Sequence, residues 1–337
     1  MLIWGAGAVG GSIGAALVRS GHSVTFVDLD RAHVAALRDP DHGLVVQDES
    51  GTFRSPVRAF TPDEVEGAWS QVLLCVKAQH TDAAVRAAEP HLTSDGWIAS
   101  LQNGLTEQLV AEVVGDQRTL GGFVNFGADV IAPGIIRFGA HGAVRVGELD
   151  GAMTDRVHEA ADLLRAFDPA AGVTSDIASY LWGKLGYAVL LYAQATGRLG
   201  IVDCLDRADL LPLWQALAGE IMRVAKAEGV MPQAFNGFDP AAFLPGANAN
   251  AARTSVAAMA DFNRGSSKTH SGVWRDLAVH KRRTEVEAHY GPVLAAAARH
   301  GITCSTLDRL VATIHAIEDG AAQEDANLDR LLEAVHV

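Results

Sequence analysis

The sequence predicts an α/β protein with a doubly wound N-terminal domain followed by an all-α C-terminal domain. The chain has 337 residues, which at roughly 100–200 residues per domain is enough for two domains, each with its own core. It opens on a strand–turn–helix–strand pattern, whereas the part after residue 176 has the periodicity of long helices. We therefore expect one domain over residues 1–175 and a second over residues 176–337.

The composition argues against several classes of function. Hydrophobic residues make up 49% of the chain and charged residues 20%, which is ordinary for a folded protein. The formal net charge is −13, so the surface is poorly suited to neutralising nucleic-acid phosphates or anionic lipids. Cys75, Cys204 and Cys304 are too far apart to indicate a disulfide framework or a metal site. We expect a cytoplasmic protein with buried thiols, no bound metal and no nucleic-acid or membrane partner.

The apolar run over residues 1–18 has the hydropathy of a membrane span or of a signal-peptide core. No positively charged region precedes it, and five glycines lie within it. A run so rich in glycine makes a weak membrane helix, so we expect neither a span nor a targeting signal here.

These glycines have the spacing of a dinucleotide-binding turn. The segment Gly5-Ala6-Gly7-Ala8-Val9-Gly10 fits G-x-G-x-x-G and lies between a predicted strand, Leu2-Ile3-Trp4, and a predicted helix. Gly5 permits the tight turn, Gly7 lets the backbone approach a pyrophosphate, and Gly10 lets the helix pack closely on the strand. The first helical turn, which includes Ala8 and Val9, presents N–H groups to the phosphates. The sequence therefore predicts a Rossmann domain; the alternative is a glycine-rich turn without a ligand.

An acidic residue indicates which cofactor this turn would bind. The second predicted strand, Ser23–Val27, ends at Asp28, 18 residues after Gly10. A carboxylate at this place accepts hydrogen bonds from the adenosine ribose hydroxyls and repels a 2′-phosphate. Arg31 could bind such a phosphate, but it follows two acids, Asp28 and Asp30, whose negative charge would oppose that binding. We expect NAD, with NADP as the alternative; Asp28 could also be an ordinary turn residue.

The rest of the N-terminal half continues the doubly wound pattern. Predicted strands at Gln71–Val76 and Trp97–Leu101 end in Lys77-Ala78 and Gln102-Asn103-Gly104, and the carboxyl ends of strands are where open sheets bind ligands. The remaining predicted elements are a helix over Thr81–Ala88, strands at Arg118–Asn125 and near Val173, a strand pair over Ile135–Val146 joined around Gly139–Gly142, and a helix over Met153–Phe167.

The C-terminal half reads as helices throughout. The segments with helical periodicity are Ile177–Thr196, Leu210–Glu228, Asn248–Asn263, His270–His280, Thr284–His300, Leu307–Ile317 and Asp325–Val335. A nucleotide-binding domain followed by a helical domain is a common plan among dehydrogenases, although a fold alone does not establish a reaction.

Several motifs, in order along both halves, resemble the ketopantoate reductase (2-dehydropantoate 2-reductase) family. They are the glycine motif, Val76-Lys77-Ala78, Gln102-Asn103-Gly104, Leu181-Trp182-Gly183-Lys184-Leu185, Thr284-Glu285-Val286-Glu287 and His300-Gly301-Ile302. The resemblance implies a Rossmann domain plus a helical domain like that of 6-phosphogluconate dehydrogenase. It also implies hydride transfer between a nicotinamide cofactor and a 2-oxo or 2-hydroxy acid.

The resemblance assigns roles to individual residues. Lys184 corresponds to the general acid or base that exchanges a proton with the substrate oxygen. Glu285 is similar to the glutamate that binds the substrate hydroxyl, and Asn103 to the asparagine that holds the lysine and the nicotinamide ribose. Lys77 is similar to a lysine beside the cofactor ribose. Taken singly, each of these residues could also be an ordinary solvated polar group.

The chain departs from the family at the substrate. The family has asparagines four and eight residues after the lysine, on the same helix face, and here these positions are Ala188 and Tyr192. A site that loses such amides loses discrimination, so we expect a substrate other than ketopantoate, with the Tyr192 hydroxyl replacing one hydrogen bond. Ser271 is the candidate for the family serine that contacts the substrate carboxylate, if a small insertion precedes Glu285.

A locally basic stretch lies close to these residues. Residues 264–285 contain six basic residues and only two acids, Asp276 and Glu285. The basic residues are Arg264, Lys268, Arg275, Lys281, Arg282 and Arg283. The stretch is either a solvated helix surface or an attractor for a small anionic substrate, for which His270 and Arg275 are further candidates.

The leading hypothesis is an NAD-dependent dehydrogenase that acts through Lys184 on a 2-oxo or 2-hydroxy acid or another secondary alcohol. The alternatives are true ketopantoate reduction in a rebuilt pocket and a non-catalytic nicotinamide sensor. The expected partner is a small anionic substrate, and a homodimer is left open.

Overall fold

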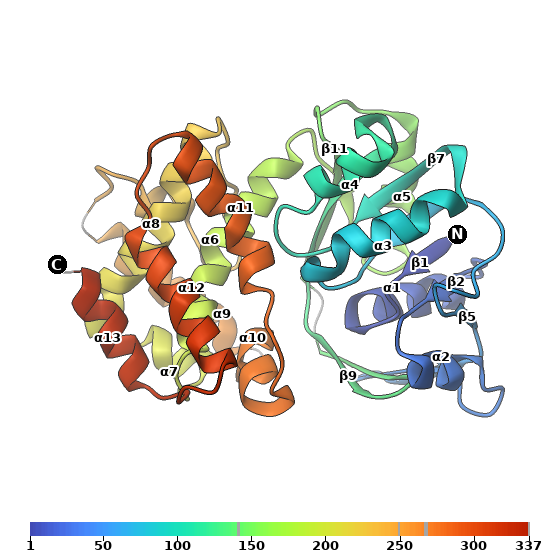
Figure 1. The fold of residues 1–337 in the computed structure, drawn as a ribbon, viewed down its shortest axis with the longest axis horizontal. Helices are drawn as coiled ribbons and strands as arrows, with labels where there is room; N and C mark the ends of the chain where they lie inside the picture. The colour runs from blue at the N-terminus through green and yellow to red at the C-terminus, as the bar shows by residue number, and fades with distance from the viewer. Residues whose placement is uncertain (140–141, 249, 266–268, 336–337) are drawn as a thin grey trace. The chain divides into compact units, whose positions relative to one another are not determined.

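The computed structural model describes residues 1–139, 142–248, 250–265 and 269–335. The chain divides into two compact units, Met1–Ile177 and Ala178–Val337. Figure 1 shows that strands and covering helices form the first unit and that helices form the second. No helix in the described ranges combines the length and the apolar character needed to cross a membrane.

An eight-stranded sheet lies at the centre of the first unit, in the order β12-β11-β8-β7-β6-β1-β2-β5. Its neighbouring strands are parallel, except for the antiparallel pair of β8 and β11. The chain passes from β1 outward to β2 and later crosses back to β6, so the order reverses beside β1, at the place where such sheets bind ligands. The strands are β1 (Leu2–Trp4), β2 (Thr25–Val27), β5 (Arg58–Phe60), β6 (Trp69–Leu74), β7 (Leu92–Ser100), β8 (Thr119–Asn125), β11 (Ala143–Glu148) and β12 (Gly172–Val173).

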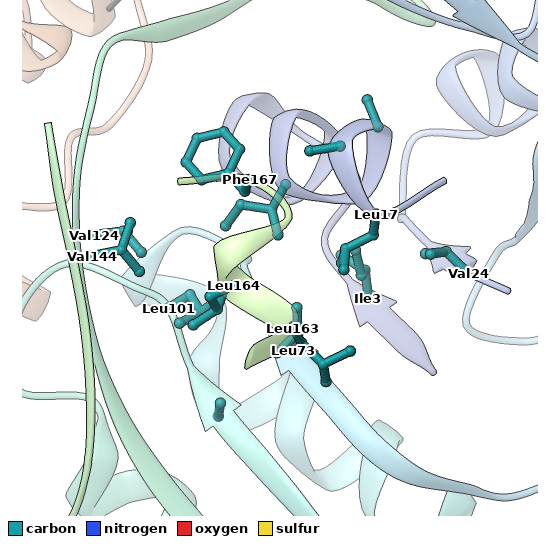
Figure 2. Close-up of a cluster of buried hydrophobic side chains, with 14 of the residues drawn as sticks. Ile3, Leu17, Val24, Leu73, Leu101, Val124, Val144, Leu163, Leu164 and Phe167 are labelled. Carbon is teal, nitrogen blue, oxygen red and sulfur yellow. The ribbon is translucent and has the colours of Figure 1, made fainter. Parts of the chain in front are cut away.

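Both faces of this sheet are buried, which confirms the predicted doubly wound fold. Side chains alternate along β1, so Ile3 packs into one apolar cluster while Leu2 and Trp4 pack into another. The first cluster receives α1 (Ala8–Arg19), α2 (Arg31–Arg38) and α5 (Asp155–Arg165), and the second receives α3 (Thr81–Ala88) and α4 (Glu107–Val114). Figure 2 shows the first cluster, where Leu163, Leu164 and Phe167 meet side chains of the sheet and of α1.

A second, four-stranded sheet was not predicted. Its order is β4-β3-β10-β9, and α1 packs so closely on it that a Cβ atom at Gly11 would lie 2.1 Å from the Ile136 side chain. The predicted strand pair over Ile135–Val146 is wrong, because β10 joins this sheet and β11 joins the large one; residues 140–141 of their connection lie outside the described residues. The actual hairpin is β9–β10, which turns at Pro133 and Gly134. The strands are β3 (Leu44–Asp48), β4 (Gly51–Ser55), β9 (Ala128–Ala132) and β10 (Ile135–Phe138).

The second unit is helical, as predicted. Its helices are α6 (Ile177–Gln194), which starts in the first unit, α7 (Ile201–Leu205), α8 (Leu211–Ala227), α9 (Ala251–Arg264), α10 (Gly272–Arg275), α11 (Val286–Arg299), α12 (Ser305–Glu318) and α13 (Ala326–Val335). The predicted start of α9 at Asn248 adjoins residue 249, which lies outside the described residues. The predicted helix His270–His280 is divided: α10 passes into a π-helical turn over Asp276–His280, which ends at Lys281 in the left-handed conformation.

Specific contacts fix how these helices pack. Glu220 of α8 is buried and accepts hydrogen bonds from the N–H groups of Thr306 and Leu307, which lie in the first turn of α12. A Cβ atom at Gly183 would lie 2.3 Å from the carbonyl oxygen of Gln233, so α6 needs glycine there. Cys204 and Cys304 are buried, and burial raises their thiol pKa values to about 12 and about 11, which keeps both protonated near neutral pH.

Candidate functional site

The turn between β1 and α1 has the geometry that the glycine motif predicts. Gly5 has φ +100°, and a Cβ atom there would lie 2.6 Å from the Val76 nitrogen. A Cβ atom at Gly10 would lie 1.9 Å from the Gly5 carbonyl oxygen, so α1 can approach β1 only without one. Gly7 differs, because no atom lies within 4 Å of its Cβ position. The open space beside Gly7 and the first-turn N–H groups of α1, at Ala8 and Val9, fit a phosphate group.

Asp28 holds this turn in place. One carboxylate oxygen accepts the Ala6 N–H at 2.8 Å and the other accepts the Asp30 N–H at 3.0 Å. The carboxylate therefore ties the end of β2 to the loop after β1. Arg31, the nearest candidate for a 2′-phosphate, donates to the Asp63 carboxylate at 3.0 Å.

His33 is a second support of the turn, and sequence reasoning missed it. The buried imidazole accepts the Gly134 N–H at Nδ1 (3.0 Å), so its proton lies on Nε2 and is donated to the Ala6 carbonyl oxygen at 2.9 Å. One side chain of α2 thus joins the glycine turn to the β9–β10 hairpin. No local sequence signal indicates this role, since it depends on a residue 101 positions away.

The two other predicted strand ends are fixed by one buried hydrogen-bond network. Gln102 donates to the Val76 carbonyl oxygen at 3.0 Å and to the Thr81 hydroxyl at 2.8 Å, and the Ser100 hydroxyl donates to the Gln102 side-chain oxygen. The network holds the loops that carry Lys77 and Asn103, both of which are half-buried. The structure therefore brings Gly5, Asp28, Lys77 and Asn103 to the same edge of the sheet.

Glu107 is an unusual buried acid close to this edge. It is the first residue of α4, its side chain is 4% exposed, and among the described residues nothing donates a hydrogen bond to its Oε1. Burial raises the pKa of Glu107 to about 8, so the carboxyl group is largely protonated at neutral pH.

In the second unit, Lys184 lies on a partly buried face of α6. Over residues 181–194 only Lys184, Ala188 and Leu191 are half-buried, and their spacing of four and three places them on one face. Tyr192 is 2% exposed, and its hydroxyl lies 2.8 Å from Nδ1 of His289. Substrate contact by Tyr192 stays a prediction, and in this structure its hydroxyl is bonded to His289.

Glu285 precedes α11 and is anchored through its neighbour. The Glu318 carboxylate accepts both the N–H and the hydroxyl of Thr284 at 2.7 Å, and it also accepts a hydrogen bond from Arg283. Glu285 itself is half-buried, and its carboxylate lies 3.9 Å from Nε2 of His289. Glu285, His289 and Tyr192 thus lie together in this unit, although the sequence analysis did not single out His289.

Ser271 has a structural role that the sequence analysis did not assign. It is buried and precedes α10, and its hydroxyl oxygen accepts the Trp274 N–H at 3.1 Å. This bond uses a lone pair of the oxygen rather than the hydroxyl proton. A contact between Ser271 and a substrate carboxylate stays a prediction.

Part of the basic stretch is neutralised by acids of the same unit. Lys268 lies outside the described residues, and Arg275 donates to the His270 carbonyl oxygen. Three further arginines of the stretch form ion pairs, which favours the interpretation as a structural surface over that of an attractor for anions. These pairs are Arg264–Asp206 at 2.6 Å, Arg282–Asp276 at 2.7 Å and Arg283–Glu318 at 3.0 Å.

Comparison with protein-family models gives two matches. Residues 1–151 match "Ketopantoate reductase PanE/ApbA", and residues 176–318 match "Ketopantoate reductase PanE/ApbA C terminal". Together these ranges cover most of the chain.

Individual relatives agree with the family models. The 2-dehydropantoate 2-reductase of Archaeoglobus fulgidus is 28% identical over 321 residues, which span 94% of this chain and 97% of that protein. The enzyme of the same name from Pyrococcus abyssi is 28% identical over 184 residues, only 54% of this chain and 58% of that protein.

Solved structures share the fold along almost the whole chain. The 2-dehydropantoate 2-reductase of Geobacter metallireducens GS-15 superposes with a TM-score of 0.78 at 25% identity, over 94% of this chain and 99% of that one. A D-mandelate dehydrogenase in complex with NADH and anilino(oxo)acetate superposes with a TM-score of 0.81 at 19% identity, over 95% and 99% of the two chains. At that identity the second likeness shows the fold alone.

Two glycines of the motif, Gly7 and Gly10, should respond differently to alanine. We expect Gly10→Ala to lower the free energy of unfolding by about 3 kcal/mol, because its Cβ atom would meet the Gly5 carbonyl oxygen. Gly7→Ala has open space and should change it by less than about 1 kcal/mol. Denaturant unfolding measures both values, and isothermal titration with a dinucleotide should show weaker binding to Gly7→Ala. Equal stability losses would contradict this assignment.

Glu107 should make the protein less stable at alkaline pH. Its folded-state pKa of about 8 lies above the ordinary 4.5, so the unfolded chain releases this proton first as the pH rises. The stabilising effect of the neutral acid is complete below about pH 4.5 and is lost by about pH 8, a change of about 5 kcal/mol at most. Denaturant unfolding of Glu107→Gln should lack this loss between pH 5 and pH 8.

Glu112→Gln is the matched control, because Glu112 lies on the same helix and is exposed. It should follow the wild-type pH curve. Parallel curves for wild type and Glu107→Gln would show that Glu107 does not titrate in this range.

Proposed function

The chain belongs to the ketopantoate reductase family, and from this premise we propose that it is a nicotinamide-dependent oxidoreductase. Its substrate would be a small 2-oxo or 2-hydroxy acid or another secondary alcohol. The observation that carries the proposal is the glycine turn, in which Asp28 holds Ala6 and open space lies beside Gly7. Residues 1–175 would bind the dinucleotide, and residues 176–337 would bind the substrate.

In the proposed reaction, a nicotinamide dinucleotide supplies the hydride for reduction or accepts it in oxidation. The Lys184 ammonium group gives its proton to the carbonyl oxygen as the hydride arrives at carbon, and it stabilises the developing alkoxide charge. In the reverse direction the neutral amine takes the hydroxyl proton. Glu285 would accept a hydrogen bond from the substrate hydroxyl, while Asn103 and Lys77 would hold the ribose next to the nicotinamide.

NAD is the proposed cofactor, with NADP as the alternative. The Asp28 carboxylate at the end of β2 would accept hydrogen bonds from the ribose hydroxyls and repel a 2′-phosphate. The pairing of Arg31 with Asp63 supports the same choice, because it engages the nearest guanidinium group. Leu29, next to Asp28, is 72% exposed and offers apolar surface for an adenine ring.

For the substrate we propose a 2-oxo acid with an apolar or aromatic side chain. Ala188 and Leu191 follow Lys184 along the half-buried face of α6 and offer no hydrogen bonds to a substrate hydroxyl. The fold shared with a D-mandelate dehydrogenase is compatible with such a substrate. The second candidate is ketopantoate, because curated relatives, including one aligned over almost its whole length, carry the name 2-dehydropantoate 2-reductase.

Lys184 is the residue on which the chemistry should depend. The test is a nicotinamide absorbance assay over a panel of aliphatic and aromatic 2-oxo acids that includes ketopantoate, with both reduced cofactors. With the best substrate, Lys184→Ala should lower kcat by about a thousandfold. Lys226→Ala, at an exposed lysine of α8, should leave kcat unchanged. Near-normal turnover by Lys184→Ala would overturn the mechanism, and selective ketopantoate reduction would overturn the proposed substrate class.

Asp28 should control the choice of cofactor. We expect kcat/KM to be higher with NADH than with NADPH, and Asp28→Asn to narrow that ratio by about tenfold, since the amide removes the charge but retains an oxygen acceptor for the Ala6 N–H. Steady-state kinetics with both cofactors measures the ratio. A wild-type preference for NADPH would contradict the prediction.

A further inference from the structure

We propose that His289 is a positioning residue that links the buried phenol of Tyr192 to the carboxylate of Glu285. The contact on the Tyr192 side is 2.8 Å, from Oη to Nδ1, and the separation on the Glu285 side is 3.9 Å, from Nε2 to Oε1. This inference rests on the proposed function insofar as Glu285 binds the substrate hydroxyl. Its structural part, the tautomer of His289, stands independently of any activity.

The Glu285 carboxylate that faces Nε2 favours one direction for the hydrogen bond between Tyr192 and His289. Burial raises the pKa of Tyr192 well above its ordinary value, and nearby Glu285 raises it further, so the phenol keeps its proton. A neutral imidazole has one donor and one acceptor nitrogen. With the Tyr192 hydroxyl donating to Nδ1, the ring proton lies on Nε2 and faces the anionic carboxylate. The opposite tautomer would place the Nε2 lone pair against that carboxylate.

The aromatic packing leaves the imidazole little freedom to turn. His289 is 5% exposed, and its ring packs edge-on against Tyr192, with centroids 5.6 Å apart. Tyr290 packs edge-on against Tyr192 at 5.1 Å. The Tyr290 hydroxyl donates to the carbonyl oxygen of Leu185, the residue after Lys184. The same cluster therefore ties α11 to α6 beside the proposed catalytic lysine.

Several other titratable groups surround this link. Tyr192 and Tyr290 are neutral phenols, and Glu285 is the carboxylate that His289 faces. Two further acids act on Tyr192 electrostatically: Asp276, which is paired with Arg282, and Glu318, which binds Thr284, Arg283 and His315. His289 is thus placed with Nε2 toward the Glu285 carboxylate, to which it can direct a proton.

This arrangement gives a role to the departure at position 192. The tyrosine there is 2% exposed and its hydroxyl is bonded to His289, so we assign it a role other than direct contact with the substrate. It instead selects the tautomer that orients the Glu285 carboxylate, so its effect on substrate binding passes through His289. The three residues form one unit, and their substitutions should be non-additive.

The kinetic test separates the two contacts of the imidazole. The amide of His289→Gln can reach the position of Nε2, and the shorter amide of His289→Asn the position of Nδ1. We expect His289→Asn to raise KM for the 2-oxo acid about tenfold, with kcat changed less than threefold, because the contact with Glu285 is lost. His289→Gln should recover part of that loss. Tyr192→Phe should raise KM in wild type but not in the His289→Asn background.

His300→Gln is the matched control. His300 follows the same helix and lies 2.6 Å from the Glu228 carboxylate, remote from the link. Its substitution should leave KM and kcat unchanged. Thermal unfolding of every variant separates lost packing from lost positioning. If His289→Asn fails to fold, Tyr192→Phe, which removes only one oxygen atom, tests the same link.

Long-range ¹H–¹⁵N NMR of the whole protein gives the readout that needs no activity. Wild type should show His289 protonated at Nε2 with Nδ1 as acceptor, and Tyr192→Phe should weaken this preference. An Nδ1-protonated ring in wild type, or additive effects of Tyr192→Phe and His289→Asn on KM, would overturn the inference. Absence of turnover with every substrate would instead overturn the proposed function and leave the NMR result to decide the tautomer.

Discussion

The hydrogen bond from the Ala6 N–H to the Asp28 carboxylate holds the glycine turn of the first unit in its shape, and the proposed dinucleotide site depends on that shape. It closes the loop between β1 and α1 against the end of β2, while His33 holds the carbonyl side of the same peptide segment. The turn is therefore restrained from both sides before any ligand arrives. Since preorganised N–H groups need no rearrangement to receive a phosphate, this restraint favours dinucleotide binding.

The same bond also limits how Asp28 can be interpreted. A carboxylate that already holds Ala6 and Asp30 has a structural role as well as a proposed role toward the ribose. Asparagine retains an acceptor oxygen whereas alanine does not, so the two substitutions report different properties. The combination of both roles in one residue couples the shape of the turn to the proposed choice of cofactor.

In the second unit the comparable constraint is the packing of α11 against α6. Tyr290 bonds to the backbone beside Lys184, Tyr192 bonds to His289, and Glu318 anchors the segment before Glu285. Leaving buried polar groups unpaired is costly, and the hydrogen bonds present here restrict these side chains to few conformations. Two arginines of the basic stretch add to these restraints, because Arg283 binds Glu318 and Arg282 binds Asp276.

The sequence by itself determined the parts of the protein that depend on local periodicity and spacing. The glycine motif, the buried strands β1 and β6 and the long helices α6, α8 and α11 follow from neighbouring residues, and the motif order indicated the family. The tertiary structure alone decided the four-stranded sheet, the division of residues 135–146 between two sheets, and the partners of His33 and His289. These depend on contacts between residues about a hundred positions apart, and a side chain's own sequence surroundings carry no signal of such a partner.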